Sequence, residues 1–433
     1  MKEIIKPIIF EWQERKLPRI IPREVNLSNY LNLTVRKVIV ITGFRRVGKT
    51  YLVFGLIDNL LGKTDRKDVL YINFEDERIP PRTEFLTALL PTIKETLGHL
   101  PSYLFLDEIQ TIPDWSKWLR RVYDKEAINF FVTGSSSKMS SKEIPTELRG
   151  RCLEVKVYPL SFREFLKFQN IELDLKNLPY LENQKATMMR ALNEYLHYGG
   201  MPEVVLAEEL KKTEILQQYY ATVVRRDIIE RFKIKNEEGL KGLLQLLLNS
   251  TIFTTNRLYN NLKSTGFKIG KTTLCHYLAH IETAYFLKSL PIFSYKIKNQ
   301  LQYPRKVYFI DNGFITTLSL KFSKNLGRLY ENVVFQELQR RFKEDEIFYW
   351  RDEKQREVDF VIKKGLKPEM LLQVAYDVED FETKRRETTA LLRASNVLQC
   401  NRLIIITADY ETEEKMKGKR IKFLPLWKWL LSE

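Results

Sequence analysis

Gly43-Phe44-Arg45-Arg46-Val47-Gly48-Lys49-Thr50 is the stretch of this sequence that decides the fold. It fits the pattern G-x-x-x-x-G-K-[ST], in which glycines let the backbone turn so tightly that successive N–H groups point at one anion. An apolar run at residues 38–41 precedes the stretch, and a helical pattern at residues 50–61 follows it. This is the strand–loop–helix context of a phosphate-binding loop, so the stretch predicts a nucleotide site at the end of a buried strand.

Within this loop, the residue types suit specific tasks. Lys49 is expected to reach the β- and γ-phosphates of ATP, and the Thr50 hydroxyl is expected to hold Mg²⁺. The helix that starts near Lys49 adds the positive end of its dipole to the site. The expected nucleotide-binding residues are Gly43, Phe44, Arg45, Arg46, Val47, Gly48, Lys49, Thr50 and Tyr51.

A second apolar run, at residues 103–106, ends in Asp107 and Glu108. Open α/β sheets bind ligands at the carboxyl ends of their strands, so Asp107 is expected to hold Mg²⁺ through water. Glu108 is then positioned to activate the attacking water, which makes it the expected catalytic base. An Asp-Glu pair after a strand is by itself more often a solvated turn, but a phosphate loop in the same chain favours the catalytic interpretation.

Further polar candidates lie near the ends of the next two apolar runs. Ser135 follows the run at residues 130–133, where it could orient water or sense the γ-phosphate. An ordinary strand-to-helix turn explains this serine equally well. Arg149 and Arg151 precede the run at residues 153–157 and are candidates for an arginine finger, with a basic surface patch as the alternative. The sequence leaves open whether such an arginine acts on its own site or on a neighbouring subunit.

Four motifs, taken in order, resemble one family of proteins. The chain is similar to the archaeal and bacterial AAA-type ATPases that carry a carboxy-terminal DUF4143 region. This resemblance implies an additional-strand P-loop sheet related to AAA+ and STAND ATPases, with Glu108 as the base. It also implies a helical lid beside the nucleotide and a tail related to PD-(D/E)xK nucleases. The motifs are residues 41–50, Tyr71-Ile72-Asn73-Phe74-Glu75-Asp76, Phe105-Leu106-Asp107-Glu108-Ile109-Gln110 and Pro159-Leu160-Ser161-Phe162-Arg163-Glu164-Phe165.

The alternation of apolar runs and helical segments sets the expected organisation of the 433 residues. Strand-like runs that are almost wholly apolar predict an α/β fold in which helices cover both faces of a central parallel sheet. A mostly helical zone, a smaller helix-rich zone and a zone with one helix followed by strands come after it. The expected domains are a P-loop ATPase domain at 1–165, a helical lid at 166–236, a winged-helix domain at 237–315 and an α/β nuclease-like domain at 316–433.

Residues 238–284 read as three helices, of which the last two are separated by a tight turn. This is a helix-turn-helix arrangement, and two strand-like runs at residues 292–295 and 306–309 would form a wing around a polar tip. The start of the third helix would then enter the major groove of DNA, whereas many winged helices instead pack domains or bind protein. The expected phosphate contacts are Lys263, Lys268, Lys271, Lys296, Lys298 and Arg305.

The tail has the order of a PD-(D/E)xK nuclease, but two of its functional positions are altered. That chemistry needs carboxylates to hold a divalent metal and a lysine to activate water. Glu331 and Asp359 are present, whereas Gln373 stands in place of an acid and Ala375 in place of the lysine. Lys384 on the following helix could partly restore the pattern. The sequence therefore predicts a degenerate site, with a nuclease-like scaffold kept for docking or DNA contact.

Composition limits the class of protein. Lys and Arg number 71 against 55 Asp and Glu, a net charge of +16, which favours polyanionic partners. Three scattered cysteines, Cys152, Cys275 and Cys400, argue against a disulfide framework or a zinc site. The first ten residues lack the apolar core of a signal peptide, and no stretch approaches the roughly 18 apolar residues of a membrane span. We therefore expect a cytoplasmic protein without membrane anchorage.

These observations together predict an Mg-ATP-hydrolysing ATPase that couples nucleotide turnover to conformational change and acts on or near DNA. Three alternatives stay open at this point: a STAND-like switch with a protein-interaction output, an ATP-dependent nuclease, and a DNA-binding regulator that merely carries a nucleotide. The expected partners are ATP or ADP and DNA. A protein partner or a second copy of the chain is left open.

Overall fold

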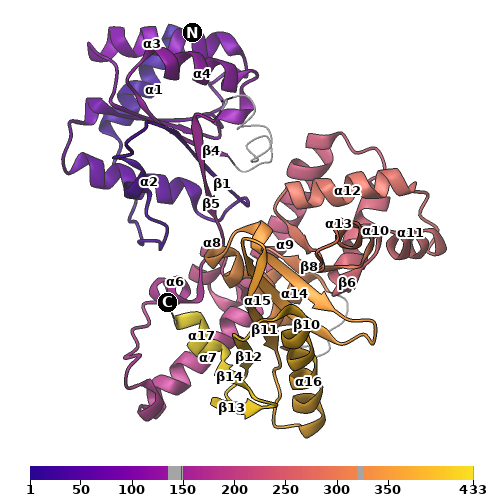
Figure 1. Ribbon diagram of the computed structural model, residues 1–433. Helices are drawn as coiled ribbons and strands as arrows, with labels where there is room; N and C mark the ends of the chain where they lie inside the picture. Colours follow the sequence, from indigo (N-terminus) through magenta and orange to yellow (C-terminus); the bar gives the residue numbers. More distant parts are fainter. Residues whose placement is uncertain (135–147, 149, 320–325, 433) are drawn as a thin grey trace. The chain divides into compact units, whose positions relative to one another are not determined.

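The computed structural model describes residues 1–134, 148, 150–319 and 326–432. The chain divides into two compact units, Met1–Tyr158 and Pro159–Glu433 (Figure 1). The first contains the phosphate loop. The second contains the middle of the chain and its carboxy-terminal α/β part.

A five-stranded parallel sheet forms the centre of the first unit. Its order is β2-β3-β4-β1-β5, so that β4 lies between β1 and β3. This is the additional-strand arrangement that the family resemblance implied. The strands are β1 (Val38–Gly43), β2 (Val69–Asn73), β3 (Tyr103–Asp107), β4 (Asn129–Gly134) and β5 (Cys152–Val157).

Helices cover both faces of this sheet, with α2 on one side and α3 and α4 on the other (Figure 1). All six residues of β1 are buried, which explains why this strand is almost continuously apolar. The amino-terminal helix packs on the same sheet, where the Trp12 indole N–H donates to the Val69 carbonyl at 2.7 Å. The helices are α1 (Lys2–Glu14), α2 (Lys49–Leu61), α3 (Thr83–Leu97) and α4 (Trp115–Lys125).

A six-stranded mixed sheet organises the carboxy-terminal part of the second unit. Its order is β13-β14-β12-β11-β10-β9, in which β11, β12 and β14 run parallel and the remaining neighbours are antiparallel. One face packs against α16 (Phe381–Leu398), and the other against α15 (Leu326–Arg341) and α17 (Leu426–Leu431). The strands are β9 (Ile347–Arg351), β10 (Glu357–Lys364), β11 (Lys367–Val374), β12 (Leu403–Thr407), β13 (Thr412–Met416) and β14 (Lys419–Pro425).

The segment expected to form a lid contributes to the core of this second unit. Side chains of α6 (Phe162–Phe168) and α7 (Glu182–Tyr198) share one hydrophobic core with α15, α17 and the six-stranded sheet. Two further helices follow, α8 (Pro202–Leu206) and α9 (Glu209–Thr222), the latter continuing into a π-helical stretch over Val223–Glu230. Therefore α6, which begins within the expected ATPase domain, and α7, which lies within the expected lid, both support the tail of the chain.

The middle of the chain contains the three helices α10, α11 and α12, two shorter helices, α13 and α14, and a three-stranded antiparallel sheet of order β6-β8-β7. The expected wing strand at residues 292–295 is not formed, because the strand that pairs with β8 lies earlier, at Leu287–Leu290. The polar tip at residues 296–300 falls largely in a short helix, α13. The elements are α10 (Glu237–Leu248), β6 (Ile252–Phe253), α11 (Thr255–Ser264), α12 (Lys271–Thr283), β7 (Leu287–Leu290), α13 (Ile297–Gln302), β8 (Arg305–Phe309) and α14 (Asn312–Leu318).

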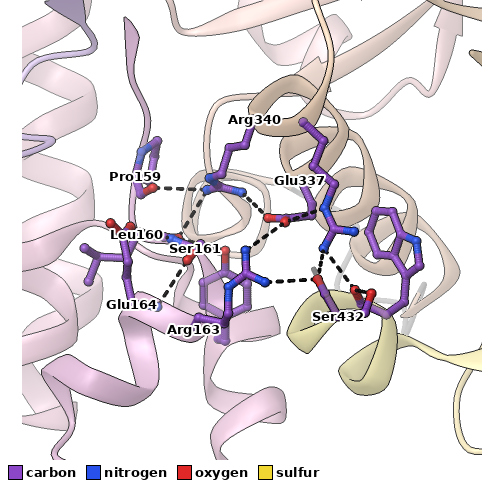
Figure 2. Close-up of polar contacts among 11 residues, drawn as sticks. Pro159, Leu160, Ser161, Arg163, Glu164, Glu337, Arg340 and Ser432 are labelled. Carbon is purple, nitrogen blue, oxygen red and sulfur yellow. Dashed lines mark hydrogen bonds and ion pairs between the residues drawn. The ribbon is translucent and has the colours of Figure 1, made fainter. Parts of the chain in front are cut away.

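A buried carboxylate, Glu337 on α15, holds the beginning and the end of the second unit together (Figure 2). It is 2% exposed and accepts from Arg341 at 2.8 Å and from Arg340 at 3.1 Å. Arg340 also donates to the carbonyls of Pro159 and Leu160, at 3.1 and 3.2 Å. These contacts fix the first residues of the second unit onto α15.

Among the helices that the structure describes, none combines the length and the apolar character needed to cross a bilayer.

Candidate nucleotide site

The phosphate loop leaves the carboxyl end of β1 and leads directly into α2. Gly43 has φ 149°, and a Cβ there would lie 2.2 Å from the Val157 carbonyl oxygen, so a side chain does not fit. Gly48 has φ 92° and caps α2, and Arg46 adopts φ 68°. Glycine tolerates such backbone angles at little cost, which explains the two glycines of the motif.

Lys49 lies under the loop rather than in solvent. Its side chain is buried, and its ammonium donates to the carbonyls of Gly43 and Phe44, each at 3.1 Å. These contacts hold the ammonium beneath the loop. The lysine therefore lies at the start of α2, where the helix dipole also favours an anion.

Asp107, at the end of β3, is the polar centre of the site. It is 3% exposed, and its carboxylate accepts hydrogen bonds from the hydroxyls of Thr50 (2.8 Å), Tyr71 (2.7 Å) and Thr133. Burial, together with the charge of Asp107, raises the pKa of the Tyr71 hydroxyl well above its usual range. All three donors are neutral, so the site retains the negative charge of the carboxylate.

Glu108 follows in the left-handed conformation, with φ 54°. Its backbone N–H donates to the Thr133 hydroxyl at 3.2 Å. Its side-chain carboxylate accepts a close hydrogen bond from the Gln110 amide. Thr133 thus binds both acidic residues at once, through the Asp107 side chain and the Glu108 backbone.

The arginine candidates have different surroundings. Arg45 lies 3.6 Å from the Glu75 carboxylate, which follows β2. Arg151 pairs with Asp124 at 2.8 Å and lies at the amino end of β5, next to the start of β1. Because strands rise about 3.3 Å per residue, the six-residue β1 puts Arg151 roughly 17 Å from the loop of its own chain. Arg149 and Ser135 lie outside the described residues.

Sequence reasoning missed Thr133, Tyr71 and Arg23. The pairing of β3 with β4 would have indicated Thr133. Leu106 lies opposite Val132, so the next residues, Asp107 and Thr133, are neighbours. Tyr71 belongs to β2, the other neighbour of β3. Arg23 donates to the carbonyls of Val47 and Tyr158, both at 2.9 Å, and nothing in its local sequence indicates this contact.

The basic residues of the middle segment are mostly at the surface. Lys263, Lys268 and Lys271 are exposed around the turn between α11 and α12, and Lys271 lies over the Tyr259 ring at 5.3 Å. Lys296 and Lys298 are exposed near α13, whereas Arg305 is half-buried in β8, 3.5 Å from the Ser289 hydroxyl.

The structure brings Glu331, Asp359 and Gln373 of the predicted degenerate nuclease site together. The Gln373 side-chain oxygen accepts from the Asp359 backbone N–H at 3.1 Å, and Ala375 lies in the hydrophobic core. Lys384 does not restore the missing lysine, because its ammonium binds Glu414 at 2.6 Å and the Tyr410 hydroxyl at 3.2 Å. A lysine from outside the expected pattern, Lys306 on β8, contacts both Glu331 and Asp359.

Comparison with known proteins agrees with this geometry. Residues 35–166 match the model of an AAA domain family, and residues 326–429 match the domain of unknown function DUF4143. An uncharacterized protein of Methanocaldococcus jannaschii is 38% identical over 450 residues, which cover 99% of this chain and 96% of the relative. The chain belongs to the AAA-domain proteins with a carboxy-terminal DUF4143 domain. This AAA–DUF4143 family membership confirms the P-loop ATPase type expected from the four motifs.

Other similarities cover parts of the chain. Residues 189–325 match a second domain of unknown function, DUF8612. A replication factor C small subunit of Methanococcus maripaludis is 26% identical over 270 residues, covering 58% of this chain and 78% of the relative. The solved structure of a Walker-type ATPase of Pyrococcus abyssi covers 70% of this chain and 99% of its own, with 14% identity and a TM-score of 0.45.

Proposed function

We propose that this AAA–DUF4143 protein hydrolyses Mg-ATP, couples turnover to a conformational change and acts on or near DNA. The observation that carries the proposal is the arrangement around Asp107. A buried carboxylate that accepts from three hydroxyl groups lies beside the phosphate loop, and Glu108 follows it immediately. A protein that only binds nucleotide does not need this second acid.

The chain's own groups divide the work as follows. The amides of the loop and Lys49 bind the phosphates, and the dipole of α2 favours their negative charge. Thr50 and Asp107 present oxygen atoms, the ligand type that Mg²⁺ prefers, so they would hold the ion. Bound there, the ion would neutralise charge on the phosphates. Glu108 would accept a proton from the attacking water once its carboxylate is released from Gln110.

The proposed action on DNA rests on the middle segment. Its order of helices and strands supports the predicted winged-helix domain, and the amino half of α12 is exposed at Lys271, Thr272 and Thr273. Such a helix start can approach DNA, with the lysines of the preceding turn on the phosphates. A relative of this chain is a replication factor C small subunit, which agrees with a task on DNA.

The test is the rate of ATP hydrolysis with and without duplex DNA, measured over a range of salt concentrations. We expect DNA to raise the rate, and the stimulation to fall steeply with salt because phosphate contacts release counterions. The variant Lys263→Ala/Lys268→Ala/Lys271→Ala should keep the basal rate and lose the stimulation. Its control, Lys364→Ala/Lys415→Ala/Lys417→Ala, removes the same charge from exposed positions elsewhere. Equal stimulation of both variants would remove the DNA contact from the proposal.

A nucleotide-dependent switch is the second candidate, and the contact between Gln110 and Glu108 favours it. A base held by a neighbouring amide gives slow turnover until another event releases it. If the protein is a switch, hydrolysis is slow with or without DNA, and ADP stays bound after gel filtration. Gln110→Ala should then raise the basal rate, whereas a fall would show that Gln110 instead positions the base.

A further inference from the structure

Three carboxylates of the second unit converge on one ammonium group, that of Lys306. Its Nζ lies 2.8 Å from Glu331, 2.7 Å from Glu357 and 2.7 Å from Asp359. The lysine side chain is only 4% exposed. It comes from β8 of the three-stranded sheet, whereas the carboxylates come from α15 and from β10 of the six-stranded sheet.

The carboxylate oxygens of the cluster have further partners. The Tyr308 hydroxyl donates at 2.5 Å to the same Glu331 oxygen that Lys306 binds, and the Val374 backbone N–H donates at 2.9 Å to the Asp359 oxygen that points away from Lys306. The Gln373 amide donates to Glu387 at 2.6 Å, away from the carboxylates.

A divalent metal, which the nuclease fold implies at Glu331 and Asp359, does not fit this arrangement. Such an ion needs six or more oxygen ligands at about 2.0–2.6 Å and would have to lie between the carboxylates. The ammonium already occupies that position and would repel a second cation strongly at this distance. The two altered positions supply no charged ligand for such an ion, because Gln373 is neutral and Ala375 lies in the core.

We propose that the Lys306 ammonium takes the place of the divalent cation in this nuclease-like site, so that the cluster clamps the middle segment to the carboxy-terminal domain. Two neighbouring contacts also join the middle segment to the carboxy-terminal domain. Lys288 on β7 pairs with Glu344 at 2.6 Å, and the Phe293 N–H donates to the Tyr349 carbonyl at 2.5 Å. The carboxylates that hold metal in a nuclease are thereby used as an intramolecular joint.

The test compares Lys306→Met with the full-length wild-type protein by thermal unfolding, with and without Mn²⁺ and in the absence of nucleotide. Loss of a buried partner should lower the melting temperature of Lys306→Met by roughly 5–15 °C. Mn²⁺ should recover part of this loss, and should have no such effect in Lys306→Met/Asp359→Asn. Lys288→Met removes an exposed pair across the same boundary and is the matched control, with a small shift and no Mn²⁺ response.

Either half of the proposal can fail. A Lys306→Met protein that melts like the wild type would show that the cluster is no clamp. A variant that is destabilised but gains no Asp359-dependent response to Mn²⁺ would show that the lysine does not stand in a cation's place. If Lys306→Met does not fold, Mn²⁺ titrations of the wild type and of Asp359→Asn decide the matter. We expect the two to be indistinguishable, and an Asp359-dependent site in the wild type would overturn the proposal.

Discussion

Two buried lysines, Lys49 and Lys306, lie near acidic side chains, but the two units use them in opposite ways. Lys49 donates to backbone carbonyls, and the nearby Asp107 receives only hydroxyl groups. Lys306 instead donates to three carboxylates directly. The first arrangement lies at the phosphate loop, beside the candidate nucleotide site, whereas in the second the charges pair with one another inside the protein.

This difference decides where the effects of substitution should appear. In the first unit, the buried charges are expected to act on a bound nucleotide, so changes should alter binding and turnover. In the second unit, Glu337 and the Lys306 cluster bind the protein's own cations, so changes should alter stability. The predictions below test this division.

The largest expected effect is that of Lys49→Ala, which should abolish ATP binding because it removes the buried charge of the phosphate loop. We expect affinity for a fluorescent ATP analogue to fall by a factor of at least about 100, as is typical for the loss of a charge that stabilises phosphate. The melting temperature without nucleotide should change little. A large loss of stability with affinity retained would break the division between the two units.

Glu108→Gln should bind ATP normally and hydrolyse it about 100- to 10,000-fold more slowly, since an amide cannot accept the proton of the attacking water. Phosphate release and equilibrium binding, measured on the same preparation, separate the two effects. Normal turnover by this variant would remove Glu108 as the base.

Glu337→Gln should destabilise the second unit by about 3–5 kcal/mol, because it leaves the buried ends of Arg340 and Arg341 without their carboxylate. Urea unfolding followed by tryptophan fluorescence measures this, with Trp429 stacked against Arg341 in the cluster. Glu344→Gln removes an exposed pair and should cost less than about 1 kcal/mol. Equal losses in both variants would contradict the role given to the buried carboxylate.

Thr133→Val should reduce the ATPase rate about tenfold, the equivalent of one or two hydrogen bonds of roughly 1 kcal/mol each. The valine cannot bind the Asp107 carboxylate or the Glu108 N–H, although its shape is nearly that of threonine. Tyr71→Phe removes only the bond to Asp107 and should have a smaller effect. An unchanged rate in Thr133→Val would show that Thr50 and Tyr71 suffice to orient Asp107.

The smallest effect concerns pH. Burial raises the pKa of Asp311 to about 7, against the opposing hydrogen bonds from the Gly200 and Gly313 N–H groups. Between about pH 4 and pH 7, the folded carboxyl therefore keeps a proton that the unfolded one loses. Stability should fall as pH rises through this window, by at most about 1.4 kcal/mol per pH unit.

Asp311→Asn should abolish this decrease of the unfolding free energy with rising pH, measured by urea unfolding. The wild type and Asp311→Asn share every other titrating group, so their difference isolates Asp311. A difference that is independent of pH would contradict the assignment.

Parts of the fold and of the candidate site could be predicted from the sequence where the residues that determine them are neighbours in the chain. The loop from Gly43 to Thr50 and the pair Asp107-Glu108 are contiguous patterns, and each element that carries them was predicted from its own residues. Thr133 was missed because its role depends on the order of the strands, which puts β4 between β1 and β3. Lys306 was missed for the same reason, since it reaches Asp359 from 53 positions away in the sequence.

The wing illustrates a different limit. Apolar runs at residues 292–295 and 306–309 looked alike, but only the second became a strand of this sheet. In the first, Ile292 and Phe293 instead contact Tyr349 of the tail, by an isolated bridge and a backbone hydrogen bond. Apolar character indicates burial, and it does not say which partner provides it.

The contacts of Arg23 have a mechanical consequence inside the first unit. Its guanidinium binds the carbonyls of Val47, in the phosphate loop, and of Tyr158, the last residue of the unit, both at 2.9 Å. A shift of Val47 can therefore reach Tyr158 through one side chain, without a relay of moving helices.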